Sequence, residues 1–264
     1  MSELIHQPIP IQTAQPARRR KRAVTTIIML VLLALIVIVG IIFAADATVV
    51  RTIQLNAQAT AVVHGIRTGQ PAIEQEQVYR NIIRTPSTYT DTLDNASNFW
   101  QASESNGNSC TFKQNSYDVH IGTQQPYTEC LEADSNYTNF LYQIHMKFVS
   151  NTWGGIIFRA SAAFTSYIFS ISPNGFYSFG GSLSYGHSAT LAYGRSAAIH
   201  TGLNQDNTIA IIARGYNISL FVNGQFVDSV QDGTFTQGAI GVYAGTLIGT
   251  PADVTFSNVS VWTL

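Results

Sequence analysis

The stretch "NTIAIIARGYNISLFVNGQFV" (residues 207–227) consists of three short apolar runs separated by two turn signals. Asn223-Gly224 is a preferred dipeptide in two-residue type I′ hairpin turns, because both central positions of that turn need a positive φ. Arg214-Gly215 separates the first run from the second. The stretch therefore predicts three consecutive strands joined by tight turns.

The same pattern of short apolar runs and turn residues extends from Pro86 to the end of the chain. Strand-like runs recur between Gly, Asn, Asp, Ser and Pro residues, among them "FLYQIHMKFV", "SYIFSIS" and "GAIGVYAG". Many short strands at regular spacing are typical of a β-sandwich or jelly roll. The 264 residues are 11% charged and 11% aromatic, a balance that also favours a β-rich domain. We predict an all-β domain over residues 87–264.

The N-terminal part has the pattern of a membrane anchor. Residues 23–45 contain no charge and would span about 35 Å as a helix, enough to cross a bilayer. The basic run "RRRKR" (residues 18–22) precedes them, and flanking positive charge is retained on the cytoplasmic side. We expect a single-pass membrane protein with a disordered cytoplasmic tail (1–22), a transmembrane helix (23–45) and an extracytoplasmic C-terminal domain. The alternative is a cleaved signal peptide ending near "AADA" (44–47), although the apolar core is longer than such peptides use.

Residues 46–86 form a predicted extracytoplasmic stalk that is partly helical. A second short helix is expected over "AIEQEQVYRNIIR" (72–84). The apolar positions of this region are too irregular to predict a coiled coil, so a spacer between membrane and domain is the preferred interpretation.

The charge of the part after the membrane segment excludes one class of partner. Residues 46–264 carry nine Lys or Arg and fourteen Asp or Glu, a net charge of −5. Affinity for a phosphate backbone comes mainly from clustered Lys and Arg, which this part lacks. Nucleic acid is therefore not expected as a ligand.

Cys110 and Cys130 are the two cysteines of the chain. An even number of cysteines outside the cytoplasm predicts a disulfide, here closing a loop of about twenty residues and stabilising the fold by about 3 kcal/mol. A zinc site or a nucleophilic cysteine is less well supported, because no CxxC, paired histidine or neighbouring base accompanies either residue.

Several segments together resemble a known group of domains. The order "DTLDNASNFW", "CTF", "WGGIIFRA", "YIFSISPNGFYSF", "NTIAIIARGYNISLFVNGQFV", "QGAIGVYAG" and "VTFSNVSVW" resembles concanavalin A-like (laminin-G-like) lectin and glucanase jelly rolls. The sequence is most similar to their bacterial branch of 3-keto-disaccharide hydrolase and glycoside-hydrolase-like domains. The resemblance covers about residues 88–264 and rests mainly on scaffold positions. It implies a bacterial, extracellular β-sandwich and predicts no particular activity.

A candidate carbohydrate site can be read from residues 153–179. If Ile156 and Phe158 face the core, alternation places Arg159 on the other face of the sheet, where Tyr167 or Tyr177 could stack on a sugar. Trp153 is the tryptophan expected to be exposed. The alternative is that Arg159 is a structural tie between a tyrosine and an acid, since a buried guanidinium needs a partner in either case.

A second polar stretch, "SYGHSATLAYGRSAAIHTG", contains Tyr193 and Arg195 together with Tyr185 and His187. These side chains could line the rim of a binding site. The preferred interpretation is a polar, Gly-rich loop.

Catalysis and metal binding receive less support from the sequence. A glycosidase needs a pair of carboxyl groups. The nearest match to a glucanase motif, Glu132-Ala133-Asp134, has Tyr137 where the motif has its second Glu. No histidine trio with ligand spacing is present. The resemblance implies a structural calcium ion, for which Asp94 and Asp253 are the candidates; no other cofactor is expected.

Three functions follow, in order of preference. The first is a membrane-anchored lectin-like module that binds carbohydrate or another cell-surface ligand without chemistry. The second is a glycoside-hydrolase-like enzyme acting on a modified disaccharide or a glucan. The third is a spacer or interaction module that binds a partner protein.

Overall fold

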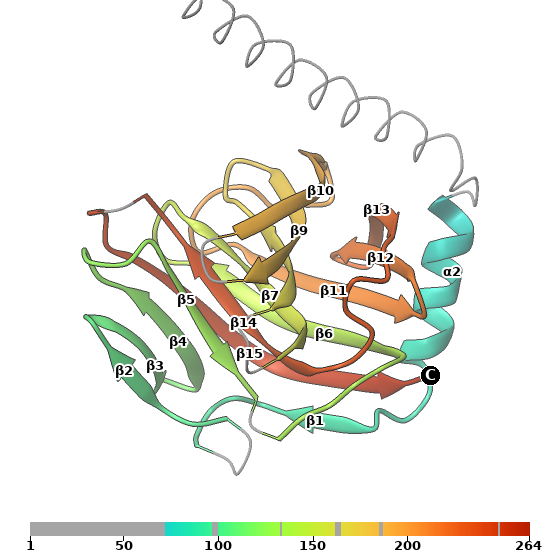
Figure 1. The fold of residues 1–264 in the computed structure, drawn as a ribbon, viewed down its shortest axis with the longest axis horizontal. Helices are drawn as coiled ribbons and strands as arrows, with labels where there is room; N and C mark the ends of the chain where they lie inside the picture. Colours follow the sequence, from blue (N-terminus) through green and yellow to red (C-terminus); the bar gives the residue numbers. More distant parts are fainter. Residues whose placement is uncertain (1–71, 97–99, 133, 162–164, 185–186, 248) are drawn as a thin grey trace, which may run out of the picture. The chain divides into compact units, whose positions relative to one another are not determined.

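The computed structural model describes residues 72–264 apart from 97–99, 133, 162–164, 185–186 and 248. The predicted tail, the membrane segment and residues 46–71 of the predicted stalk lie outside this part. Within it, no helix is long and apolar enough to cross a membrane. The described chain forms two antiparallel β-sheets and one helix (Figure 1).

Sheet A has nine strands in the order β13-β12-β11-β6-β15-β4-β3-β2, with β1 paired to β15. Its strands are β1 (Tyr89–Asp91), β2 (Ser103–Ser105), β3 (Asn108–Lys113), β4 (Ser116–Ile121), β6 (Phe140–Phe148), β11 (Asp206–Arg214), β12 (Asn217–Val222), β13 (Gln225–Gln231) and β15 (Ala252–Thr263).

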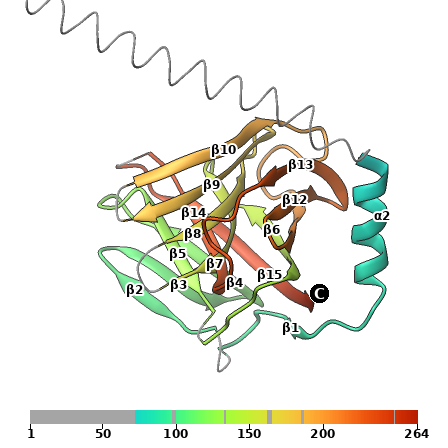
Figure 2. The ribbon, with the colours of Figure 1, turned by 45° about the vertical axis from the view of Figure 1, so that its right-hand side comes forward.

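Sheet B has six strands in the order β10-β9-β8-β7-β14-β5. Its strands are β5 (Tyr127–Leu131), β7 (Trp153–Ala160), β8 (Ser166–Ile171), β9 (Phe176–Ser184), β10 (His187–Arg195) and β14 (Ala239–Gly245). Strands β10 and β5 form its two edges, and β10 and β9 lie together at one of them (Figure 2).

The main core lies between the two sheets and is filled by alternate residues of their facing strands. Phe140 of sheet A meets Phe158 of sheet B edge to face, with ring centroids 6.3 Å apart. Phe158 in turn stacks on Phe179 of β9 at 6.0 Å. Each of these rings is fully buried, so truncating any of them to alanine would cost about 3–5 kcal/mol.

The turns predicted by the opening stretch are present. Asn223 and Gly224 have φ angles of 52° and 75° and join β12 to β13 through a two-residue turn between Val222 and Gln225. The Asn223 side chain also accepts a hydrogen bond from the Thr208 amide at 2.8 Å. A local sequence signal therefore fixes the register of β11, β12 and β13.

Helix α2 (Ala72–Ile83) packs on the outer face of sheet A (Figures 1 and 2). Tyr79 stacks on Phe221 with centroids 5.0 Å apart and donates a hydrogen bond to Gln143. After the helix, Trp262 Nε1 donates to the Thr85 carbonyl at 2.9 Å. The helix expected over 72–84 is thus present, but it is part of the folded domain. Its apolar face is buried against the sheet, while residues 46–71 of the predicted spacer lie outside the described residues.

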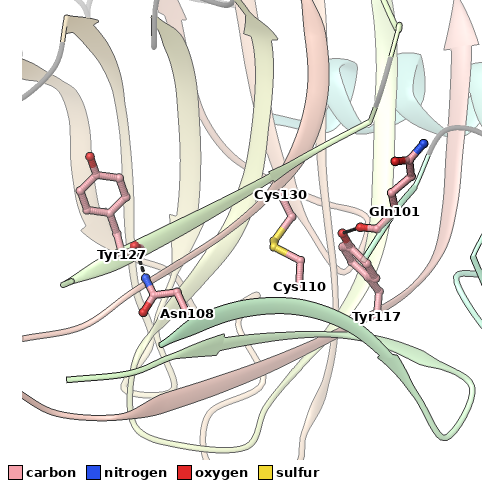
Figure 3. Close-up of a disulfide and its surroundings, with 6 residues drawn as sticks. All are labelled: Gln101, Asn108, Cys110, Tyr117, Tyr127 and Cys130. Atoms are coloured by element: carbon pink, nitrogen blue, oxygen red, sulfur yellow. Dashed lines mark hydrogen bonds between the residues drawn. A yellow bond between two sulfur atoms is a disulfide. The ribbon is translucent and has the colours of Figure 1, made fainter. Parts of the chain in front are cut away.

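The predicted disulfide between Cys110 and Cys130 is confirmed. It joins β3 of sheet A to β5 of sheet B, so it links the two layers at one end of the sandwich (Figure 3). Beside it, the Asn108 side-chain amide donates to the Tyr127 carbonyl at 2.9 Å. Edge strand β5 is therefore held to β3 by a covalent bond and a hydrogen bond.

Candidate functional site

Arg159 does not lie on an exposed sheet face. The β7–β14 pairing shifts register near Ala239, and Arg159 itself has a φ of 49°, so its side chain leaves the alternation of the strand. The residue is 1% exposed. Its guanidinium donates to the carbonyl oxygens of Thr138 at 2.7 Å, Gly215 at 3.0 Å and Phe235 at 3.0 Å. Desolvation lowers the pKa of Arg159 from its usual value.

Tyr167 and Tyr177 face the space between the sheets, where both are buried. Tyr167 lies opposite Phe158 in the β7–β8 register, and its hydroxyl donates to Asp232. Tyr177 donates to Asp228 Oδ2 at 2.8 Å. The prediction that Arg159 shares an exposed sugar-binding face with these tyrosines is therefore wrong. Arg159 is a structural tie, as the alternative proposed, but its partners are main-chain carbonyls and not an acid.

The opposite surface of sheet B carries aromatic and small polar side chains. Alternation from the buried residues Ile156, Phe169, Phe179 and Val242 defines this outer face. One row of paired residues crosses all six strands, from the edge strand β5 to the edge strand β10. Its members are Glu129, Tyr243, Gly155, Ser170, Ser178 and Tyr193.

Three rings form an aromatic cluster at the β10 side of this face: Trp153, Phe176 and Tyr193. Phe176 and Tyr193 stack with centroids 5.7 Å apart, and Trp153 lies 6.5 Å from Tyr193. Trp153 and Tyr193 come from strands separated by β8 and β9, so their side chains lean toward each other over these strands. Tyr193 is 59% exposed. Trp153 is thus the one predicted ligand residue that lies on this face.

A second aromatic pair, Tyr127 and Tyr243, lies at the β5 side. Their rings stack at 6.5 Å, and the ring of Tyr243 covers the position that a Cβ on Gly245 would occupy. Gly245 of β14 pairs with Tyr127 on one side and with Trp153 on the other. The Tyr127–Tyr243 pair is therefore next to the Trp153 end of the aromatic cluster. Figure 3 shows the Tyr127 ring on the other side of β5 from the disulfide.

The residues between these rings are small. Ser170 and Ser178 are adjacent across β8 and β9, and Gly155 follows on β7. A Cβ on Gly155 would overlap the Phe169 carbonyl, so this position cannot carry a side chain. The row between the rings therefore carries only short side chains, and of these Ser178 is partly exposed whereas Ser170 is buried.

Two charged side chains flank the rings. Arg195 ends β10 with its guanidinium carbon 4.1 Å from the Phe176 centroid, a cation–π arrangement. Glu129 on β5 is partly buried, which raises the pKa of its carboxyl group. Among the described side chains that these six strands direct to the outer face, Glu129 is the one acid. The strands of this face do not offer the pair of carboxyl groups that most glycosidases use.

Only part of this site can be predicted from the sequence. Tyr193 and Arg195 lie in strand β10 (residues 187–195), where the sequence predicts a polar loop. Phe176, Tyr127 and Tyr243 also lie on this face, and no local motif marks them as ligand residues. Their aromatic character and their outward parity were visible in the sequence, but the strand order that brings them to one face was not.

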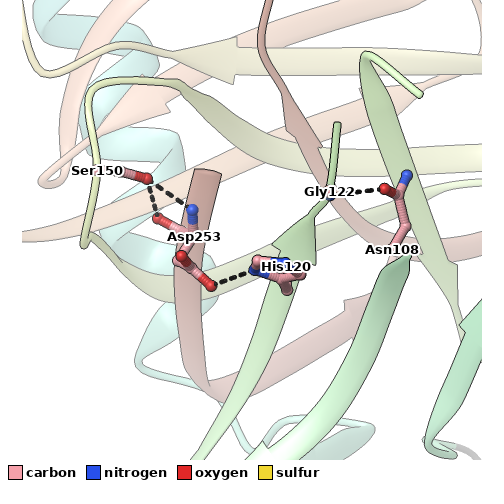
Figure 4. Close-up of polar contacts among 5 residues, drawn as sticks. All are labelled: Asn108, His120, Gly122, Ser150 and Asp253. Carbon is pink, nitrogen blue, oxygen red and sulfur yellow. Dashed lines mark hydrogen bonds and ion pairs between the residues drawn. The ribbon is translucent and has the colours of Figure 1, made fainter. Parts of the chain in front are cut away.

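The two calcium candidates lie apart. Asp253 Oδ1 is 2.8 Å from His120 Nδ1, and the Asp253 backbone amide donates to Ser150 Oγ at 2.6 Å (Figure 4). Asp94 lines an open pocket of about 500 Å³ with Asp91, whose two carboxylate oxygens accept from Leu93 N and Tyr89 Oη. In the described part of the chain no three His, Cys, Asp or Glu side chains form a metal-binding group. The structural calcium ion therefore stays a prediction.

Comparison with known proteins establishes the fold. No protein-family model and no curated protein matches the sequence. A Bacillus subtilis protein of unknown function with a galectin-like fold has 11% identity and a TM-score of 0.54, over 68% of this chain and 96% of that chain. A β-glucanase from Bacillus licheniformis has 13% identity and a TM-score of 0.51, over 68% and 100%. A β-1,3-1,4-glucanase (lichenase) derived from a mouse hindgut metagenome has 12% identity and a TM-score of 0.51, over 67% and 99%. The jelly-roll β-sandwich predicted from the sequence is confirmed as the fold of the described residues.

Proposed function

We propose that this concanavalin A-like β-sandwich is a carbohydrate-binding module whose binding surface is the outer face of sheet B. The observation that carries the proposal is the aromatic cluster of Trp153, Phe176 and Tyr193, in which Tyr193 is exposed and the other two rings are partly exposed, continued by Tyr127 and Tyr243. The apolar face of a sugar ring stacks on such side chains.

Binding without catalysis is favoured over hydrolysis. Glucanases share this fold, but at identities of 13% or below that likeness extends to the fold alone. The strands of the outer face contribute one described carboxyl group, Glu129, whereas hydrolysis of a glycosidic bond generally requires two.

The same proposal includes a location. The uncharged segment 23–45 would anchor the chain in a membrane, with residues 1–22 in the cytoplasm and the β-sandwich outside. Protease added to intact cells should then remove the β-sandwich and leave an epitope tag at the N-terminus protected. Protection of the β-sandwich in intact cells would contradict this orientation.

The test of binding uses the full-length chain in detergent and affinity electrophoresis through gels that contain neutral or acidic polysaccharides. Retardation by at least one polysaccharide is expected. Trp153→Ala should weaken it about tenfold or more, which corresponds to about 1.4 kcal/mol of stacking energy. Tyr216→Ala is the matched control, because Tyr216 is 64% exposed but lies at the β11–β12 turn of sheet A.

Equal loss in the two variants, or no retardation by any polysaccharide, would contradict the proposal. In the second case capture of a protein by the same face, lost in Trp153→Ala, would identify the domain as a protein-interaction module.

A further inference from the structure

Arg195 is held in place without being neutralised. Its guanidinium lies over Phe176, which in turn stacks on Tyr193 with an interplanar angle of 19°. Within the described residues it makes no hydrogen bond or ion pair. A guanidinium is planar and carries five N–H donors, so stacking fixes its plane and leaves its edge available to a ligand.

The acids that could have neutralised Arg195 are engaged elsewhere. Asp228 comes from β13, which contacts β10, but it accepts the Tyr177 hydroxyl on the inner side of sheet B. Asp206 pairs with Lys147 at 3.2 Å on sheet A. In a part of the chain with a net charge of −5, an arginine left unpaired on an aromatic platform is a specific feature of this surface.

The one described acid on the strands of this face is too far away to compensate. Glu129 lies on β5 and Arg195 on β10, five strand spacings apart. At about 4.8 Å per spacing the separation is about 24 Å, well beyond the screening length of about 8 Å at physiological ionic strength. The β10 side of the outer face is therefore locally cationic.

We infer that the module recognises a polysaccharide that carries carboxylate groups, a uronate polymer, with one carboxylate on Arg195 and the adjoining sugar ring on the aromatic cluster. This inference rests on the proposed function. A carboxylate matches the fork of a guanidinium with two parallel hydrogen bonds, and such charge-assisted bonds are stronger than bonds between neutral groups. The stacked rings beside Arg195 contact the sugar ring of such a polymer, a contact that a free carboxylate ion cannot make.

The experiment compares two polymers with one backbone. Polygalacturonate carries a carboxylate on each sugar, and its methyl ester carries none. Affinity electrophoresis of the full-length chain in detergent should show at least tenfold tighter binding of the acid form. Alginate and its ester provide a second pair with a different backbone.

The variants separate the charge from the ring contacts. Arg195→Gln should abolish the preference for the acid forms and leave binding of the esters unchanged. Arg214→Gln, an exposed arginine at the end of β11 on sheet A, should behave as the unaltered chain. Trp153→Ala should weaken binding of acid and ester alike. Unchanged melting temperatures confirm that each variant is folded.

Each contrary outcome is distinct. Equal binding of acid and ester overturns the inference and leaves the proposed function standing, as does binding of neutral glucans alone. Equal loss in Arg195→Gln and Arg214→Gln overturns it in favour of non-specific charge attraction. Failure to bind any uronate polymer also overturns it, and the neutral polysaccharides then test the proposed function separately.

Discussion

Two arginines of sheet B contrast the inside of the sandwich with its outer surface. Arg159 is 1% exposed and gives its donors to three carbonyl oxygens of three different loops. Arg195 is exposed, rests on Phe176 and has no polar partner in the described part of the chain. The role of a charged residue in a strand therefore depends on its environment. Arg159 holds three loops together, whereas the N–H groups of Arg195 remain open to solvent.

The largest expected effect is the loss of Arg159. Arg159→Ala would leave three carbonyl groups without their donor and open a space in a buried region, so the free energy of unfolding should fall by about 3–5 kcal/mol. Urea denaturation followed by tryptophan fluorescence measures this change. A loss below about 1 kcal/mol would mean that Arg159 is not a structural tie, and the contrast with Arg195 would disappear.

A buried acid, Glu132, provides a further test of what burial does to a charged group. Glu132 is 2% exposed, and its Oε2 has no hydrogen-bond partner. Burial raises the pKa of Glu132 from 4.5 to about 7; hydrogen bonds from Ser135 and Tyr89 oppose this rise, and the charge of Asp91 adds to it. The groups around it are the phenols Tyr89, Tyr137 and Tyr142, the Asp91 carboxylate and the Ser135 hydroxyl.

The folded state therefore binds the Glu132 proton more tightly than the unfolded chain does. The stabilisation is complete below about pH 4.5 and is lost as the pH rises through about 7, by up to about 3 kcal/mol. Glu132→Gln should remove this part of the pH dependence. Chemical denaturation at a series of pH values gives the two profiles, and identical slopes for the two proteins would show that Glu132 does not titrate as expected.

Much of the scaffold was predictable because its signals are local. A type I′ turn follows from Asn223-Gly224, and the Cys110–Cys130 bond follows from the presence of two cysteines in a domain that the sequence predicts to be extracytoplasmic. The outer face of sheet B, the proposed binding surface, was harder to predict for a physical reason. Its rings lie on β5, β14, β7, β9 and β10, and the order of these strands depends on contacts between residues far apart in the chain. Arg159 was misplaced because a bulge in β7, set by pairing with β14, interrupts the alternation on which the prediction relied.

Two tyrosines extend the comparison to hydroxyl groups, with a smaller effect. Tyr177 donates to Asp228 on the inner side, whereas Tyr193 makes no hydrogen bond with any described residue. Tyr177→Phe should lower the free energy of unfolding by about 1 kcal/mol, because the carboxylate loses a donor in a partly buried site. Tyr193→Phe should leave it unchanged. Calorimetric melting of both variants measures the difference, and equal melting temperatures would show that the inner hydrogen bond contributes nothing.

The smallest effect is expected at Arg195 itself. Its stacking on Phe176 takes place at an exposed site, where removal of a surface side chain changes stability by no more than about 0.5 kcal/mol. Arg195→Ala should therefore unfold at the same urea concentration as the unaltered chain, within error. A large loss of stability would make Arg195 a second structural tie, and its effect on ligand binding would then be indirect. Retained stability would support the proposed role of Arg195 in ligand binding. Its position on the Phe176 ring would then not be explained by a contribution to folding.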